Sequence, residues 1–172
     1  YLPTKSWKIV KLMLGIHLGY DESRGLFHFE AQIIENKSYV FHESLKPHGG
    51  FALYIWDTGE FVLSVGGYHK EFLPYKPSYY PHPPRLGVSW KPNKKTTVTV
   101  DCYFTLCSNA VMAGAYGGVE YKSWFKAWAN AGFDALVMWD PFYYSFKIKF
   151  SLGWKWKSCG GSIKASFKFS GP

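Results

Sequence analysis

The sequence predicts an all-β protein, an antiparallel meander of about eight to ten strands that closes into a barrel or forms a strongly curved sheet or sandwich. Two observations predict this class. Aromatic residues make up 20% of the 172 residues, and their side chains favour the half-buried surface of a sheet. Large apolar residues also alternate with polar ones along much of the chain, which is the period of a strand. A chain of this length suits one domain over 1–172.

The first half of the chain contains strand signals separated by short turns. Alternating apolar residues predict strands over 6–20 and 26–34, joined by a turn at 21–25. Two more strands are expected at 51–56 and 60–69, on either side of the turn at 57–59. Gly66 and Gly67 indicate a bulge or a close approach of two backbones inside the second of these.

Residues 72–85, FLPYKPSYYPHPPR, contain five prolines. Proline has no N–H to give to a strand ladder and favours extended backbone in the residue before it. The segment is therefore expected to be a long crossing loop. Its density of Tyr, His and Arg side chains is unusual for a connector, so it is also a candidate binding segment.

The second half is expected to hold longer strands. We predict strands at 86–90, 96–106, 118–133 and 135–139, with only a flexible turn at 114–118. Asp140-Pro141 is a turn, and a long alternating strand follows from Phe142. Cys159-Gly160-Gly161 is expected to be the last hairpin turn, before a closing strand over 163–169.

Cations and rings are segregated in the last two predicted strands, because successive side chains alternate across a strand. A binder of single-stranded nucleic acid needs both on one surface, so no specific nucleic-acid partner is expected. We interpret the rings as interior and the lysines as solvated, and the alternative is that the lysines meet an anionic lipid or protein surface. The lysines are Lys147, Lys149, Lys155, Lys157, Lys164 and Lys168, opposite Phe146, Ile148, Phe150, Trp154, Trp156, Phe167 and Phe169.

The formal net charge of +8 permits an anionic partner without selecting one. No apolar run reaches the roughly 18 residues of a membrane helix, so the chain is not expected to be transmembrane. An outer-membrane barrel is the less favoured alternative, because the proline loop and the charged turns count against it. The chain begins at Tyr1 without Met or a signal pattern and is expected to be part of, or processed from, a longer chain.

Cysteines and histidines give no metal motif. Cys102, Cys107 and Cys159 are an odd number without a CxxC spacing, which slightly favours a reducing compartment. Cys102 and Cys107 have opposite parity and are expected on opposite faces. The six histidines form no metal-binding pair, and nucleophile-elbow and phosphate-loop motifs are absent from the sequence. No metal or cofactor is expected.

The function expected from these residues is non-catalytic binding of a hydrophobic ligand, lipid-like or aromatic, in an aromatic-lined cavity or groove rimmed by residues 72–85. One alternative is a carbohydrate-binding module that stacks exposed Tyr or Trp rings on sugars. Another is a cofactor-free isomerase or cyclase with His69 or His82 as general acid or base and Arg85 as an anion clamp. The expected ligand-binding residues are Tyr75, Tyr79, Tyr80, His82, Arg85 and Trp90.

The motifs of the central segment occur in a fixed order. They are FVLSVGGYHKEFLPYKPSYYPHPPRLGVSW at 61–90, then AVMAGAYGGVEY, SWFKAW and WDPFYYSFKIKFSLG. This order resembles a domain family of unknown function from large β-rich bacterial and fungal proteins, in which GGYH, YP-PPRLG-W, MAGG, AWF and W-PFYY follow one another. The resemblance covers about 51–153. It implies repeated amphipathic strands within a longer polypeptide, and it brings no catalytic residues.

Overall fold

The structure, a computed structural model, describes residues 10–172. These residues form strands joined mostly by short turns, with one long connection at 66–85 and two single-turn 3-10 helices, η1 and η2. The predicted strand at 6–20 is β1 and β2, and residues 6–9 of it lie outside the described residues. The bounds are β1 Val10–Lys11, β2 Leu14–Asp21, β3 Leu26–Ile33, η1 Glu35–Lys37, β4 Tyr39–Val40, β5 Leu45–His48, β6 Gly50–Trp56, β7 Phe61–Val65, η2 Lys70–Phe72, β8 Leu86–Trp90, β9 Thr96–Cys107, β10 Ala110–Lys122, β11 Lys126–Trp139, β12 Phe142–Trp156 and β13 Cys159–Gly171.

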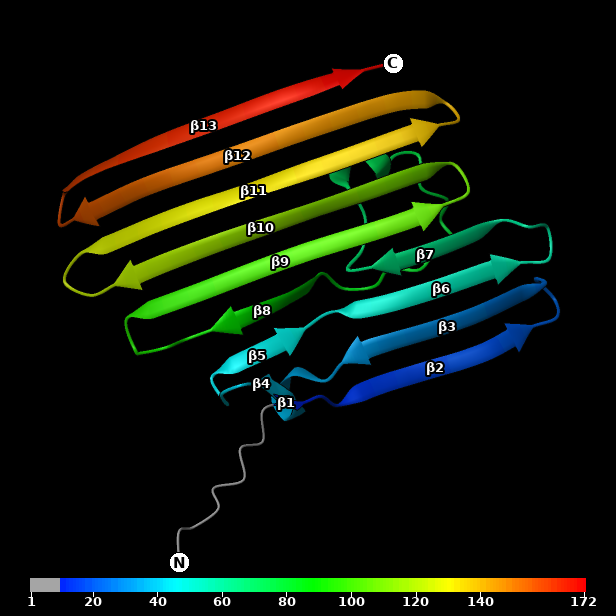
Figure 1. The fold of residues 1–172 in the computed structure, drawn as a ribbon, viewed down its shortest axis with the longest axis horizontal. Coiled ribbons are helices and arrows are strands. Elements are labelled where there is room, and N and C mark those ends of the chain that lie inside the picture. The colour runs from blue at the N-terminus through cyan, green and yellow to red at the C-terminus, as the bar shows by residue number, and fades with distance from the viewer. Residues whose placement is uncertain (1–9) are drawn as a thin grey trace, which may run out of the picture.

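One 11-stranded antiparallel sheet makes up most of the structure (Figure 1). Its main path runs β13-β12-β11-β10-β9-β7-β6-β3-β2, and β8 and β5 extend it beside β9. The predicted all-β antiparallel class is confirmed. Closure into a barrel is not confirmed, because the sheet is open and has β13 at one edge and β2 at the other.

The strand β9 pairs with two short strands that lie end to end. Its residues Phe104–Cys107 face β7 and its residues Val98–Cys102 face β8. β7 ends where Gly66 takes a positive φ of 75°, which favours glycine. A Cβ there would meet the backbone of Cys102 and Leu86. The close approach of backbones predicted at Gly66 is therefore confirmed, and it marks where the chain leaves the sheet for the crossing loop.

Three predicted boundaries in the second half are wrong. Residues 114–118 are the middle of β10 and not a turn, and the predicted strand at 118–133 is divided by a turn at 123–125. The last hairpin turn is Lys157-Ser158, one step before the predicted Cys159-Gly160-Gly161, so Lys157 lies in the turn. The first and third errors involve glycine, which also marks turns, whereas the turn at 123–125, Ser-Trp-Phe, has no glycine or proline to indicate it.

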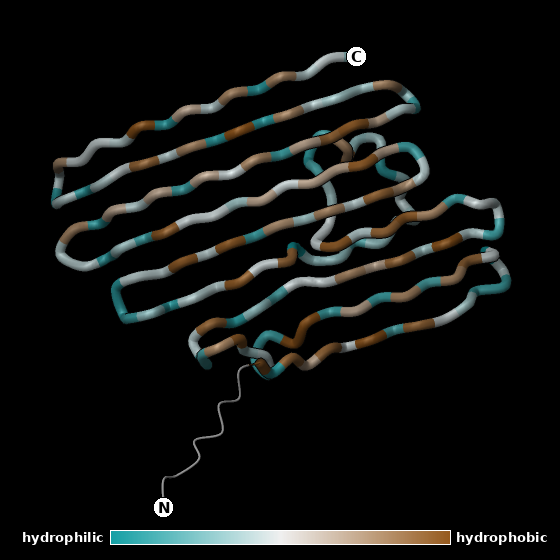
Figure 2. The backbone as a smooth tube through the Cα atoms, in the orientation of Figure 1, coloured by the Kyte–Doolittle hydropathy of each residue, from teal (hydrophilic) through white to brown (hydrophobic). Residues whose placement is uncertain are grey.

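Hydrophobic and polar residues alternate along β11, β12 and β13 (Figure 2), and this alternation gives the sheet two chemically different faces. We call the face that carries Asp134 and Lys149 the polar face and the face that carries Phe146 and Phe150 the apolar face. Strand register places the two sets of side chains on opposite sides from β9 to β13. The predicted segregation of lysines from rings is therefore confirmed on β12 and β13.

The core lies where residues 66–85 cross the polar face near the β9–β10 and β11–β12 turns. Phe72 of η2 is fully buried against Met112, Leu136 and Met138. This explains the run ALVMW, which is apolar at every position because Leu136 and Met138 are covered on the polar face and Ala135, Val137 and Trp139 belong to the apolar face. The core residues are Val62, Tyr68, Phe72, Tyr80, Tyr103, Cys107, Ala110, Met112, Leu136 and Met138.

The apolar face is uncovered within residues 10–172. Phe146, Phe150 and Trp154 keep 46%, 45% and 47% of their surface exposed. The interpretation that these rings fill an interior is therefore wrong for the described residues. Alternation decides which side chains share a face, but it does not decide what lies on that face.

Candidate functional site

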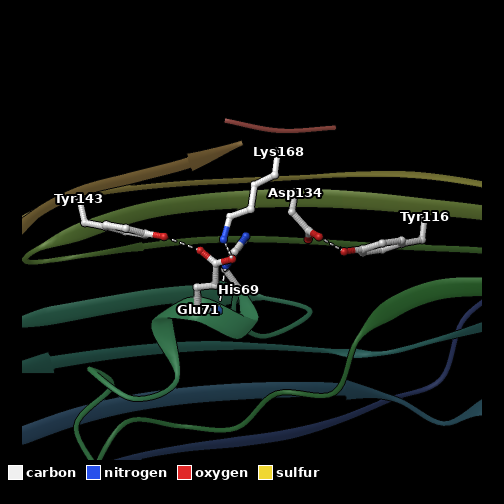
Figure 3. Close-up of polar contacts among 6 residues, drawn as sticks. All are labelled: His69, Glu71, Tyr116, Asp134, Tyr143 and Lys168. Atoms are coloured by element: carbon white, nitrogen blue, oxygen red, sulfur yellow. Dashed lines mark hydrogen bonds and ion pairs between the residues drawn. The ribbon is translucent and has the colours of Figure 1, made fainter. Parts of the chain in front are cut away.

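A cluster of hydrogen-bonded carboxylates and tyrosines lies on the polar face where residues 66–85 meet the sheet (Figure 3). Tyr103 donates a hydrogen bond of 2.7 Å to Asp134 Oδ1, and Tyr116 donates to Asp134 Oδ2. Both rings reach across the neighbouring strand because the residues opposite them, Gly114 and Gly132, have no side chain to block them. Burial, and then the bond to Asp134, raise the pKa of both tyrosines.

Glu71 of η2 connects this segment to the last two strands. It accepts hydrogen bonds of 2.7 Å from Tyr143 and 2.6 Å from Lys168 (Figure 3). Burial alone would raise the pKa of Glu71, but these bonds and the Lys168 charge outweigh it and lower the pKa to about 2. Glu71 is thus an ionised anchor for the crossing segment.

His69 and Arg85 both contact the ring of Tyr103 from the crossing segment. Arg85 stacks over this ring at 4.0 Å from its centroid and donates to the Tyr68 carbonyl. His69 is buried, caps η2 by accepting from the Glu71 N–H at 3.0 Å, and has its pKa lowered by burial. Its Nε2 has no hydrogen-bond partner among residues 10–172. The predicted catalytic candidate His69 and the predicted anion clamp Arg85 therefore contact the same ring, that of Tyr103, and hold the crossing segment against the sheet.

The other candidate residues do not join this cluster. Tyr80 is buried, and both it and the exposed Tyr79 donate to Glu60. His82 is exposed beside β2 and β3, away from His69, and Tyr75 is exposed. Trp90 is 38% exposed and lies on the apolar face with Val88 and Leu86. The six predicted ligand-binding residues thus occupy separate places, and their binding function stays a prediction.

Beyond the crossing segment the polar face is hollowed into a groove of about 500 Å³ across β9 to β13. A smaller hollow of about 260 Å³ continues it toward Lys70 and Arg85. The two share Asp101, Tyr116 and Lys149. We call them together the polar groove, and its lining includes Thr99, Gly118, Asn130, Gly132, Lys149 and Lys164.

The apolar face contains a trough along β10 and β11. Register places Ala113 opposite Ala135 and Gly117 opposite Ala131, so small side chains meet across the pair. Larger side chains rise on both sides, among them Phe104 on β9 and Phe150 on β12. A shallow hollow of about 100 Å³ lies between Val111, Ala113, Ala135 and Val137. We call this strip the apolar trough.

No metal-ligand cluster is present among residues 10–172, since no three His, Cys, Asp or Glu side chains gather there. Cys102 lies on the apolar face and Cys107 is buried on the polar face, so their predicted opposition is confirmed. In the part of the chain that is described, no helix has the length and apolar character to cross a membrane.

Sequence reasoning gave no role to the two carboxylates that organise the cluster. Glu71 lies within the crossing segment, and Asp134 interrupts the apolar run 133–139 on the face that carries the lysines. That interruption was the available signal, because a charge inside a strand needs a partner. Its partners Tyr103 and Tyr116 come from two other strands, and spacing along the chain does not indicate this.

The comparison with known proteins gives a family and no relatives of known activity. No curated protein and no solved structure matches the chain. The profile of a family described as "Family of unknown function (DUF6603)" matches residues 1–172. The match is longer than the 51–153 over which the motifs indicated a family of uncharacterised domains. The chain therefore belongs to the family of unknown function DUF6603.

Proposed function

We propose that this chain is a non-catalytic binding module that holds an elongated apolar ligand, such as a fatty acyl chain, in the apolar trough. The observation that carries the proposal is the composition of the apolar face. From β9 to β13 the side chains on this face include no charged residue, and they leave many large apolar groups exposed. Contiguous apolar surface on this scale is typical of a binding surface.

The shape of the trough favours a narrow, extended ligand. The stretch of β11 from Ala127 to Ala135 is about 27 Å long at about 3.4 Å per residue. Alanine and glycine line most of its floor, and Phe133 and Val119 rise within it. A hydrocarbon chain lying there would contact the walls formed by Phe150, Leu152 and Val100. Burial of its methylene groups would supply the affinity.

The test is a titration with a fluorescent fatty acid, displaced by unlabelled palmitate. Ala131→Trp fills the trough and is expected to weaken binding about tenfold. Ala165→Trp places the same ring on β13 outside the trough and is expected to change affinity less than about twofold. Native mass spectrometry of protein from its natural source should show bound species with acyl-chain masses.

The opposite results would overturn the proposal. If the fatty acid does not bind, or if Ala131→Trp binds it as tightly as the unchanged protein, the trough is not a ligand site. If sedimentation shows a dimer that palmitate does not dissociate, the apolar face is covered by a second copy and the proposal is wrong.

A further inference from the structure

On the polar face a flat ring lies on each side of a row of small and polar residues, Tyr116 in the polar groove and Trp128 in a neighbouring hollow of about 400 Å³. Tyr116 lies across Gly132, where a Cβ would clash with the ring, and Trp128 lies across Gly153 in the same way. Between the two rings, one cross-strand row of residues runs from β9 to β12, and it consists of Thr99, Gly118, Asn130 and Ser151. Rings that lie along a sheet offer a face to a ligand, whereas upright rings would fill the groove.

Hydroxyl and amide groups line the floor between these rings. Thr99, Asn130 and Ser151 can each donate and accept hydrogen bonds. The floor spans five strands, from β9 to β13, which is about 19 Å at about 4.8 Å per strand. An extended ligand rich in hydroxyl groups fits this surface better than a compact one.

The groove carries more positive than negative charge. Its cations are Lys70, Arg85, Lys149 and Lys164, and its carboxylates are Asp101, which bonds to His48 at 2.9 Å, and Asp134, which accepts from two tyrosine hydroxyls. Lys149 and Lys164 line the groove and form no ion pair within residues 10–172. Arg85 lies at the inner end, and its Nη1 is buried without a hydrogen-bond partner in the described part of the chain.

We propose that the polar groove binds an acidic oligosaccharide, with a carboxylate or sulfate of the sugar at Lys149 and Lys164. One sugar ring would lie on Tyr116, and the sugar hydroxyls would bond to Thr99, Asn130 and Ser151. Tyr75 and Tyr79 of the 72–85 segment and Trp90 of β8 take no part, so the site differs from a surface built of these exposed rings.

The experiment is isothermal titration of the full chain with tri-galacturonic acid. The fully methyl-esterified trisaccharide is the matched ligand, because it keeps the hydroxyl groups and has no charge. The acid is expected to bind, and the ester is expected to bind about tenfold more weakly, because hydrogen bonds between charged groups are the stronger ones.

The matched variants remove the same charge from the same hairpin. Lys149→Ala with Lys164→Ala should weaken binding of the acid about tenfold or more. Lys155→Ala with Lys157→Ala removes two lysines outside the groove and should change affinity less than about twofold. All four side chains are on or beside the exposed β12–β13 hairpin, so both double variants are expected to fold, and circular dichroism checks this.

Four outcomes would overturn the proposal. The first is no heat of binding with the acid, and the second is equal affinity for acid and ester. The third is an equal loss in both double variants, which would show non-specific attraction to a basic protein. The fourth is competition by sodium sulfate at the same molar concentration as the trisaccharide, which would show a site for small anions alone.

Discussion

The hydroxyl of Tyr143 donates a hydrogen bond of 2.7 Å to Glu71, which joins β12 to the helix η2 that crosses the sheet. Lys168 on β13 reaches the same carboxylate. The crossing segment is therefore tied to two strands, β12 and β13, at one ionised group. Its stability should depend on the charge of that group.

Glu71→Gln is expected to lower the free energy of unfolding at pH 7 by about 1–2 kcal/mol, because the pKa of the carboxyl is lowered in the fold and the partly exposed pair is screened by water. A lowered pKa stabilises the fold above the unfolded value of 4.5, and this contribution is lost as the pH falls toward about 2. Urea midpoints of variant and unchanged protein should therefore converge over that range. Glu22→Gln, at an exposed turn, is the control, and a gap that stays constant to pH 2 would contradict the expectation.

Tyr80→Ala should destabilise the protein far more than Tyr79→Ala, although the two residues are neighbours and both bind Glu60. The Tyr80 ring is 3% exposed and stacks on Trp56 at 5.6 Å, so its loss leaves a cavity that costs about 3 kcal/mol. Tyr79 is half exposed, and its loss should cost less than about 1 kcal/mol. Urea denaturation measures both, and equal losses would argue against a packed crossing segment.

Gly132→Ala and Gly117→Ala are a matched pair in neighbouring strands of the sheet. A Cβ at Gly132 would displace the Tyr116 ring from its place over β11 and weaken the contact with Asp134, at a cost of about 1–2 kcal/mol. A Cβ at Gly117 meets nothing within 4 Å, and alanine there should be neutral or stabilising by about 0.5 kcal/mol. Thermal unfolding checks the difference, and similar melting temperatures would mean that Tyr116 does not depend on the glycine.

His69 should make the protein less stable as the pH falls below 6.5. Burial lowers its pKa in the fold, so the unfolded chain takes up a proton at a higher pH than the folded chain does. The stability is fully present above 6.5 and declines as the pH falls from there. His69→Asn keeps an acceptor for the helix N-terminus and should remove this slope, as measured by urea midpoints between pH 7.5 and 5.5. If His82→Asn removes the slope instead, the assignment to His69 is wrong.

Leu136→Ala and Phe167→Ala compare the covered side of the sheet with the open one. Leu136 is fully buried beneath η2, and its truncation should cost about 2–5 kcal/mol. Phe167 is 67% exposed on the apolar face, and its truncation should cost less than about 1 kcal/mol. A large loss for Phe167→Ala, measured by denaturation of the dilute protein, would show that this face is covered in solution.

Much of the strand order could be predicted from alternation and turns, because the period of two is a local property. Residues 26–34, 86–90 and 96–106 behave as expected, and so does the proline segment at 72–85. β10 was missed because its centre, GAYGG, is made of residues that also form turns. Gly114 leaves room for the ring of Tyr103 to cross over β10, and Gly118 leaves room for the side chain of Asn130.

The openness of the sheet could not be predicted from the same pattern. A strand that faces a core and one that faces an unfilled surface have the same alternation, so Phe150 gives no signal that it is half exposed. The polar cluster was also inaccessible to sequence reasoning. Glu71 meets Tyr143 only because the chain leaves the sheet at Gly66 and crosses back over later strands.

The position of β13 at the end of the sheet has a consequence for self-association. Its outer backbone groups have no strand beside them among residues 10–172, so a second molecule could dock there by antiparallel strand addition. If two copies of β13 met symmetrically about Ser166, Lys164 of each would stand directly opposite Lys168 of the other. Like charges in that position repel, so these two lysines oppose the simplest route by which the sheet could grow into a fibre.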